Sequence, residues 1–329
     1  MWLSDNWHDY EVIDTSSGEK VERWGDVILV RPDPQVIWQT DKKHPAWKNW
    51  QGYYHRSAKG GGSWDSHGMP EIWTVSYQLP LASQLTFRLQ PFSFKHTGLF
   101  PEQAANWDWF TKLLQSNTEE RFSVSIKPDT AEPSPVLPKV LNLFAYTGGA
   151  TLAAAAAGAH VTHVDASKGM VTWAKENAAA SGLSDAPIRW LVDDCVKFVE
   201  REIRRGNKYD AIIMDPPSYG RGPKGETWKI EDNVFQLIQR TSLLLSDTPR
   251  FFLISSYTTG LQPGVLRQML ELVFGEKVSG RNTEERFSVS IKPDTAEPSP
   301  VFPIEADELG LPVTSGGILP CGASGRVTF

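Results

Sequence analysis

The chain has 329 residues, of which 40% are hydrophobic and 22% charged, so it can bury one large core or two medium ones. It has two cysteines, no basic segment followed by a short apolar run, and no apolar stretch of membrane length, which argues against secretion and membrane spanning. We therefore expect a cytoplasmic protein without a membrane partner. The net charge of −6 counts against a nucleic acid substrate, because phosphate contacts dominate affinity for nucleic acids.

Residues 1–90 have the pattern of a small β-rich domain. Apolar and polar residues alternate, with turns at short intervals, and this alternation is typical of strands that are buried on one face. The expected strands are 11–15, 20–24, 26–30, 73–77 and 85–89.

The segment Lys42–Lys59, between these two groups of strands, interleaves basic residues with aromatic rings. Such a mixture suits a nucleic acid surface, because cations contact phosphates and rings stack on unpaired bases. In the alternative interpretation, Trp47, Trp50 and Tyr54 form the core of a Trp-rich domain and the lysines are ordinary surface residues. The sequence leaves both interpretations open.

Two identical segments, Asn117–Val136 and Asn282–Val301, interrupt the chain. Together they contribute −4 of the net charge of −6, so the remaining chain is close to −2 and the objection to an RNA substrate weakens. In each copy, Phe, Val and Ile alternate with polar residues before a run of prolines, which predicts one short strand and an extended tail. A duplication, a sequence artefact or an engineered insertion would explain two perfect copies, and we assign them no catalytic role.

Two polar runs follow apolar strands in the second half of the chain. Asn142–Gly149 has the form of a strand that enters a glycine turn and a helix, where a ligand can approach bare backbone. Asp215–Gly220 follows the apolar strand 211–214 and ends it with a carboxylate and two prolines. Ligands of open α/β sheets bind beyond the carboxyl ends of the strands, so the two runs predict one small-molecule site at one edge of a sheet.

The first run matches neither of the common phosphate-binding loops. Thr147–Thr151 lacks the G-x-G-x-x-G spacing of dinucleotide sites, and no Gly-Lys-Ser/Thr follows it. The run instead resembles the first motif of class I S-adenosylmethionine (SAM)-dependent methyltransferases. That resemblance implies a Rossmann-like, doubly wound α/β sheet with SAM as cofactor.

The resemblance continues in order along the chain. Val161–Asp165 is similar to the second strand of these enzymes, whose terminal carboxylate binds the ribose hydroxyls, which makes Asp165 the ribose ligand. In the alternative interpretation, Asp165 or Ser167 only caps the helix expected at 168–180. Leu191–Cys195 resembles the third motif and implies that Asp194, rather than the neighbouring Asp193, accepts from the adenine amino group.

Upstream of this core, Phe94–Gln103 is similar to a segment of a bacterial 23S ribosomal RNA methyltransferase family with cytosine-C5 and guanine-N7 methylating members. In that family the segment folds over the methionine end of SAM. The resemblance covers about 95–260 and implies RNA, 23S rRNA in particular, as the partner. The residues that it assigns to the cofactor are Thr97, Gly98, Leu99, Gln103, Asn142, Phe144, Tyr146, Thr147, Gly148, Gly149, Asp165, Ala166, Ser167, Asp194, Cys195 and Asp215.

The chain departs from this family at the position that decides the mechanism. Cytosine-C5 methylation needs a thiolate that adds to the ring, and family members with that chemistry carry a Cys after the fifth strand. Here the strand 251–254 runs into Ser255 and Ser256. Cys195 and Cys321 lie elsewhere and are interpreted as small buried or incidental thiols. The acceptor is therefore expected to be nitrogen rather than carbon.

The run Asp215–Tyr219 suits a nitrogen acceptor. An exocyclic amine can donate to the Asp215 carboxylate and to a carbonyl of the rigid Pro216–Pro217 segment, while Tyr219 stacks on a base taken out of its helix. Transfer would then depend on proximity and orientation. In the alternative interpretation, Tyr219 packs the loop and Asp215 caps a turn. The residues assigned to catalysis are Asp215, Pro216, Pro217 and Tyr219, and no metal is expected.

We therefore expect a β-rich domain over 1–90 with a possible RNA-binding role, a connecting segment over 91–138, and a methyltransferase domain over 139–329 that contains the second repeat at 282–301. The expected function is methyl transfer from SAM to a base nitrogen in ribosomal RNA. The alternatives are methylation of a protein or small molecule, and a SAM-binding RNA module without transfer activity. The sequence assigns no oligomeric state.

Overall fold

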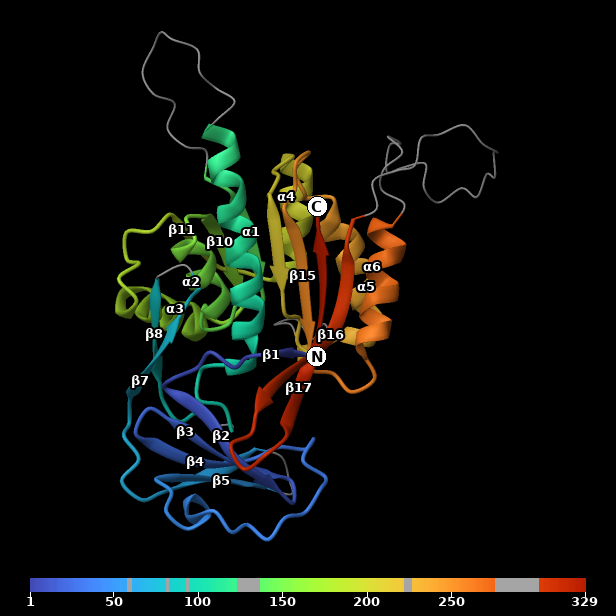
Figure 1. Cartoon of the computed structure of the whole chain (residues 1–329). Helices are drawn as coiled ribbons and strands as arrows, with labels where there is room; N and C mark the ends of the chain where they lie inside the picture. The colour runs from blue at the N-terminus through green and yellow to red at the C-terminus, as the bar shows by residue number, and fades with distance from the viewer. Residues whose placement is uncertain (58–60, 81–82, 93–94, 123–136, 222–226, 276–301) are drawn as a thin grey trace.

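The computed structural model describes residues 1–57, 61–80, 83–92, 95–122, 137–221, 227–275 and 302–329 (Figure 1). It confirms the expected α/β class, with a large sheet flanked by helices and a smaller β-rich N-terminal unit. None of the described helices is long and apolar enough to cross a membrane.

The large sheet has the strand order β1-β16-β17-β15-β12-β9-β10-β11. The five strands from β15 to β11 are parallel, and β17 runs antiparallel to both of its neighbours. Chain order reverses between β9 and β12, so the topological switch point lies at the carboxyl ends of these two strands. The strands are β1 (Trp2–Leu3), β9 (Lys139–Leu143), β10 (His160–Asp165), β11 (Ile188–Val192), β12 (Ala211–Met214), β15 (Phe251–Ser256), β16 (Ile304–Pro312) and β17 (Ile318–Thr328).

Helices cover both faces of this sheet because successive residues of its central strands point to opposite sides. In β12, Ile213 packs on the side of the first three helices, whereas Ile212 packs on the side of the last three. Both residues are nearly inaccessible to solvent, as expected for the apolar run of a central parallel strand. The first three helices are α1 (Ala104–Phe122), α2 (Gly149–Ala156) and α3 (Lys168–Ala180), and the last three are α4 (Cys195–Arg205), α5 (Ile230–Ser242) and α6 (Pro263–Phe274).

The N-terminal unit contains all five strands that the alternation pattern predicts. Three of them, with two further strands, form the sheet β2-β3-β4-β5-β6, and β7 pairs with β8 in a separate hairpin. That hairpin packs on α3, where the backbone N–H of Arg88 donates to Asn177 Oδ1 at 2.8 Å. The strands are β2 (Tyr10–Ser16), β3 (Glu19–Trp24), β4 (Val27–Pro32), β5 (Gly52–Arg56), β6 (Gly62–Ser66), β7 (Trp73–Gln78) and β8 (Gln84–Leu89).

The hairpin β16–β17 joins the two parts of the molecule. It begins in the large sheet and extends to the N-terminal unit, where Val313 forms a β-bridge with Val12 (Figure 1). The N–H groups of Thr314 and Ser315 donate to the carbonyls of Val12 and Ile13 at 2.9 and 3.0 Å. One continuous apolar core also runs from the N-terminal sheet to α1 and α2, so the two parts are packed directly on each other.

In the aromatic and basic segment from Lys42 onward, some side chains are packed in the fold and others are exposed. Tyr54 is 3% exposed, and the Trp47 indole donates to Asp14 Oδ2 at 2.7 Å while Lys42 lies over its ring, so these residues belong to the fold. Lys48 and Arg56, by contrast, are exposed on the surface.

The repeated segments lie largely outside the described residues. Helix α1 continues to Phe122, so residues 117–122 of the first copy are helical. The alternating stretch for which we expected a strand begins at Phe122 and otherwise lies outside the described residues. Residues 123–136 and the whole second copy, which stands between α6 and β16, are outside the described ranges.

Candidate active site

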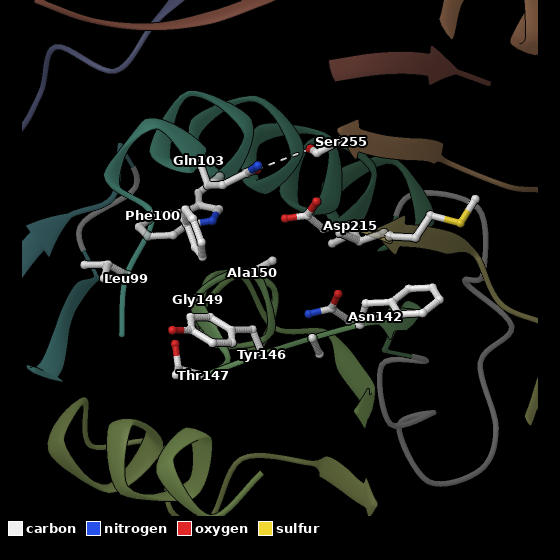
Figure 2. Close-up of a pocket in the computed structure, with 15 residues that line it drawn as sticks. Leu99, Phe100, Gln103, Asn142, Tyr146, Thr147, Gly149, Ala150, Asp215 and Ser255 are labelled. Atoms are coloured by element: carbon white, nitrogen blue, oxygen red, sulfur yellow. Dashed lines mark hydrogen bonds between the residues drawn. The ribbon is translucent and has the colours of Figure 1, made fainter. Parts of the chain in front are cut away.

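A pocket opens where β9 and β12 end side by side, as the two sequence runs predict (Figure 2). Its walls come from the segment before α1, from the loop between β9 and α2, and from the ends of β12 and β15. Of the predicted site residues, this pocket brings together Leu99, Gln103, Asn142, Phe144, Tyr146, Thr147, Gly149 and Asp215. It also contains Phe100, Trp107, Ala145, Ala150, Ile213, Met214 and Ser255, which were not predicted as ligands.

The loop between β9 and α2 holds an unusual backbone path. Phe144 and Tyr146 have φ values of 55° and 50°, which non-glycine residues adopt infrequently, and Gly148 has φ 90°. Gly148 is the N-cap of α2 and has no side chain with which to cap it. The first N–H groups of α2 are therefore available to a polar ligand in the pocket.

Glycine is required at two positions by close contacts with tryptophan rings. A Cβ atom on Gly149 would lie 2.7 Å from Trp107 Cζ2, and one on Gly98 would lie 2.3 Å from Trp173 Cζ2. The Thr147 hydroxyl donates to the Gly98 carbonyl at 2.5 Å, so the loop and the upstream segment are held together. Thr97 Oγ1 is buried nearby and has no hydrogen-bond partner within the described chain.

Asp165 lies at the end of β10 and organises the same loop. Its Oδ2 accepts from the Tyr146 N–H at 2.9 Å and its Oδ1 from the Ser167 N–H at 2.8 Å, across Ala166. Burial raises the pKa of this carboxyl, partly offset by the two N–H donors. Helix α3 is capped by Ser167, whose Oγ accepts from Met170 N. Capping is thus performed by Ser167, and the ribose role of Asp165 stays a prediction.

The third motif lies beside a neighbouring hollow instead of in the pocket. Asp194 caps α4 by accepting from Lys197 N at 2.9 Å, and it lines a groove between α4, α5 and Trp228. Cys195 is buried, accepts from the Phe144 N–H at 3.2 Å, and has its pKa raised by that burial. The adenine role of Asp194 is not tested by these contacts.

The acceptor run forms a rigid turn at the end of β12. The Pro217 carbonyl accepts from the Trp228 indole at 2.6 Å, whereas the Pro216 carbonyl accepts no hydrogen bond within the described residues. Tyr219 begins β13 (Tyr219–Arg221), which pairs with β14 (Thr227–Lys229), and is 51% exposed. Of the two prolines, Pro216 is therefore the one whose carbonyl is available to a ligand.

Asp215 points into the pocket (Figure 2) and has no hydrogen-bond partner within the described residues. Burial, and secondarily the nearby Glu102 carboxyl, raises its pKa to about 7. Glu102 is 5% exposed and its own pKa is raised by burial. In the alternative interpretation Asp215 caps a turn, but its carboxylate accepts no hydrogen bond from the described residues.

Ser255 occupies the end of β15, where carbon-methylating relatives of the predicted family carry their thiol. Its hydroxyl lies 2.9 Å from Ser324 Oγ and 3.5 Å from Gln103 Oε1 (Figure 2). Neither described cysteine reaches the pocket lining. The residues that line this pocket therefore include no sulfur nucleophile.

The pocket and the residues next to its lining fit SAM. The glycine turn, the uncapped helix start and the orphaned Thr97 hydroxyl suit the charged methionine end of the cofactor, and Asp165 is the acid nearest the loop that could accept from hydroxyls. When bound, SAM supplies a methyl carbon activated by its sulfonium group. The fold and site together define a methyltransferase of the doubly wound class.

Comparison with known proteins gives the family. A family model for S-adenosylmethionine-dependent methyltransferases matches residues 133–252. A SAM-dependent methyltransferase from Agrobacterium tumefaciens is 30% identical to this chain and superposes with a TM-score of 0.80. The match covers 99% of this chain and 92% of that protein. The chain therefore belongs to the S-adenosylmethionine-dependent methyltransferases, and SAM is its cofactor.

More distant comparisons agree in fold. A methyltransferase structure solved in complex with S-adenosylhomocysteine (SAH) has a TM-score of 0.66 at 17% identity over 98% of this chain and 76% of that one. Ribosomal RNA large subunit methyltransferase K/L of Shewanella frigidimarina is 38% identical over 109 residues, or 32% of this chain. That match spans only 15% of the length of the Shewanella protein.

Sequence reasoning missed several residues around Asp215. Phe100 lies between the rings of Tyr146 and Tyr257, at 5.5 and 5.3 Å between centroids, and Tyr257 and Glu102 interact with the Asp215 carboxylate. Phe100 and Glu102 lie inside the segment Phe94–Gln103, and the family resemblance of that segment could have indicated them. Tyr257 had only its position after β15 as a signal.

Proposed function

We propose that the chain transfers the methyl group of SAM to a base nitrogen in ribosomal RNA, in the large-subunit RNA of a bacterial cytoplasm. The observation that carries this proposal is the Asp215 carboxylate, which points into the pocket without a hydrogen-bond partner among the described residues. A carboxylate is the acceptor that an exocyclic amine needs, and the Pro216 carbonyl beside it can accept the second N–H.

The chemistry at Asp215 follows from its environment. Partial burial strengthens a hydrogen bond from an amine to the carboxylate, because water competes less for both groups. Two acceptors on one side of the amine orient the nitrogen lone pair toward the opposite side. The residues of the chain thus position and orient the acceptor, and the cofactor provides the electrophile.

Nitrogen is favoured over carbon by the hydrogen bonds at Ser255. A hydroxyl that is buried between Ser324 and Gln103 has no base beside it to make it a nucleophile, and it cannot replace a thiolate in addition to a pyrimidine ring. The lining of the pocket offers orientation rather than covalent activation.

RNA is supported by cations that lie next to the pocket. Lys20, Arg31 and Lys95 gather where β3 and β4 face the segment before α1, and the carboxyl groups of Glu22, Asp33 and Glu102 accompany them. Lys95 makes one hydrogen bond, to the Pro32 carbonyl at 3.1 Å, and no ion pair within the described chain. An ammonium group with unused donors beside an acceptor site suits a phosphate of the target strand.

The names of the partial relatives point to the same substrate class. The Shewanella and Pseudoalteromonas atlantica proteins are named ribosomal RNA large subunit methyltransferases, and the latter is 40% identical over 102 residues. These matches cover the cofactor-binding core, so they support the cofactor directly and the substrate by analogy.

Incubation with labelled SAM and separate RNA, protein and metabolite fractions tests the proposal. We expect label in ribosomal RNA and, after digestion, in an N-methylated nucleoside. Asp215→Asn should remove the label, whereas the exposed Asp185→Asn should not. The appearance of 5-methylcytosine would contradict the nitrogen assignment, label in protein or metabolites would favour those substrates, and SAM binding without any transfer would identify a binding module.

A further inference from the structure

A chain of buried side chains connects β17 to the pocket. Arg326 is 5% exposed, and its Nε and Nη2 donate to Asn106 Oδ1 at 3.0 and 2.7 Å. Asn106 Nδ2 donates to Gln103 Oε1 at 2.8 Å, and Gln103 Nε2 donates to the Tyr257 hydroxyl oxygen at 2.8 Å. Gln103 lines the pocket together with Asp215.

The direction of donation along this chain is set at Arg326. A guanidinium group donates but cannot accept, so the amide atom of Asn106 that faces it must be oxygen. The Asn106 nitrogen therefore faces Gln103 and Ser324, whose oxygens lie at 2.8 and 3.0 Å and use both of its protons. Gln103 must in turn present oxygen to Asn106 and nitrogen to Tyr257.

This order decides where the Tyr257 proton points. Because the Tyr257 oxygen already accepts from Gln103, its own proton is free for another acceptor, and the Glu102 carboxyl is a hydrogen-bonding neighbour of the hydroxyl. Glu102 and Asp215 are the two carboxyl groups that interact here. With the chain reversed, Tyr257 would donate to Gln103 and the acid pair would lose this donor.

Arg326 is held in place independently of the pocket. Its guanidinium lies 3.6 Å from the ring centre of Trp2 and 4.9 Å from that of Trp109, and Nη2 also donates to the Ala105 carbonyl at 2.9 Å. Burial lowers its pKa to about 9, partly offset by Glu305 and Asp307 on β16, so it stays charged near neutral pH. The donor at the start of the chain is therefore permanent.

We propose that Arg326 is a positioning residue that fixes the direction of hydrogen-bond donation through Asn106 and Gln103, so that the Tyr257 hydroxyl proton is directed to Glu102, the carboxyl that forms a pair with Asp215. Other charged or titratable groups that face this pair are Lys20 of β3, Asp33 after β4 and Cys321 of β17. The inference rests on the proposed function in that Asp215 is taken as the acceptor carboxylate.

Asn106→Asp tests the direction of donation. Aspartate still accepts from Arg326 but cannot donate to Gln103, which must turn its amide and present oxygen to Tyr257. Loss of a donor to the ionised pair should raise the midpoint of its titration by roughly one pH unit. The midpoint is measured from the acid limb of kcat/KM and, without any turnover, from 13C NMR of labelled carboxyl groups.

A second variant separates this effect from the added negative charge. In a Tyr257→Phe background, Asn106→Asp should produce no further shift, because the donor at the end of the chain is already absent. A shift of equal size in that background, or no shift in Asn106→Asp alone, would overturn the proposal. The NMR titration detects the direction of hydrogen-bond donation even if no RNA is methylated. Failure of this proposal can therefore be distinguished from failure of the proposed function.

Arg326→Met and Arg250→Met form a matched pair for effects of folding, because Met cannot donate a hydrogen bond. Both arginines are buried and donate to backbone carbonyls of α1, but Arg250 contacts Leu113 and Leu114 at the end far from the pocket. Both substitutions should lower the unfolding temperature, and only Arg326→Met, which leaves the Asn106 amide free to turn, should move the carboxyl titration. Equal movement in both would show a structural role alone and would overturn the proposal.

Discussion

The Thr147 hydroxyl donates a 2.5 Å hydrogen bond to the carbonyl of Gly98, and both groups are buried. This single contact joins the turn after β9 to the segment that precedes α1, although 49 positions separate them in the chain. The two segments that are predicted to bind SAM, one before α1 and one after β9, are therefore held together directly by a hydrogen bond.

Thr147→Val should remove the hydrogen bond between these two segments. The Gly98 carbonyl would lose its donor, and a buried hydrogen bond contributes about 1 kcal/mol, so we expect SAM affinity to fall roughly fivefold. Thr147→Ser keeps the hydroxyl and is the matched control. Calorimetric titration with SAM measures both, and equal affinity in all three proteins would contradict the assignment of this contact to the cofactor site.

Gly98→Ala should be far more damaging than Gly182→Ala. Both glycines have positive φ, 103° and 70°, but only at Gly98 would the new Cβ collide with the Trp173 ring. We expect Gly182→Ala to cost about 1 kcal/mol of unfolding free energy from backbone strain, and Gly98→Ala about 2–4 kcal/mol from strain and crowding. Urea unfolding gives both values, and SAH affinity should fall only in Gly98→Ala.

Methyl transfer should depend on pH through Asp215. Its pKa is raised from 3.8 to about 7 by burial and by Glu102, so the carboxyl is mostly protonated below pH 7 and ionised above it. If the ionised form binds the acceptor amine, kcat/KM should rise with pH through about 7 and then level. An acid limb centred near pH 4 would contradict this expectation.

The same shift has a signed effect on stability. Between the unfolded pKa of 3.8 and the folded value of about 7, the native state binds more protons than the unfolded state, so this group lowers stability as pH rises through that window. Asp215→Asn removes the titrating group. It should therefore raise the unfolding temperature, relative to the unmodified protein, more at pH 8 than at pH 4.

Lys95→Gln should weaken RNA binding and leave SAM binding unchanged. Burial lowers the pKa of Lys95 to about 8, so it is largely charged at pH 7 and loses its charge as pH rises through 8. Lys208 precedes β12 and therefore lies at the edge of the sheet opposite the pocket. It also donates to one backbone carbonyl, that of Leu243 at 2.8 Å, and is the matched control. Filter binding at several salt concentrations should show a shallower salt slope for Lys95→Gln alone.

Local patterns were sufficient to predict much of the fold. Helix α3 begins after Ser167 and ends at Ala180, and β12 spans 211–214, both with the bounds expected from the sequence. A capping serine next to periodic apolar residues, and a short apolar run that ends at Asp-Pro-Pro, are signals within a few residues of each other. The cofactor loop was predictable for the same reason.

The surroundings of the Asp215 carboxylate were not predictable in this way. Asn106 and Arg326 are 220 positions apart and meet only because β17 inserts beside β15 against α1. Asp194 is a second example. Its position as the N-cap of α4 follows from the local sequence, but whether it contacts the adenine depends on tertiary placement. Contacts that depend on tertiary placement leave no periodic trace in the sequence.

The hairpin β16–β17 is shared by the large sheet and the N-terminal unit, and Val313 is bridged to Val12 at its far end. A β-bridge and a common apolar core hold the two parts together, so we expect no hinge motion that separates them. If RNA is the substrate, as proposed above, the target nucleotide must therefore move out of its own stack to reach the pocket, and we expect an unpaired or easily unstacked nucleotide to be chosen over one held in a stable helix.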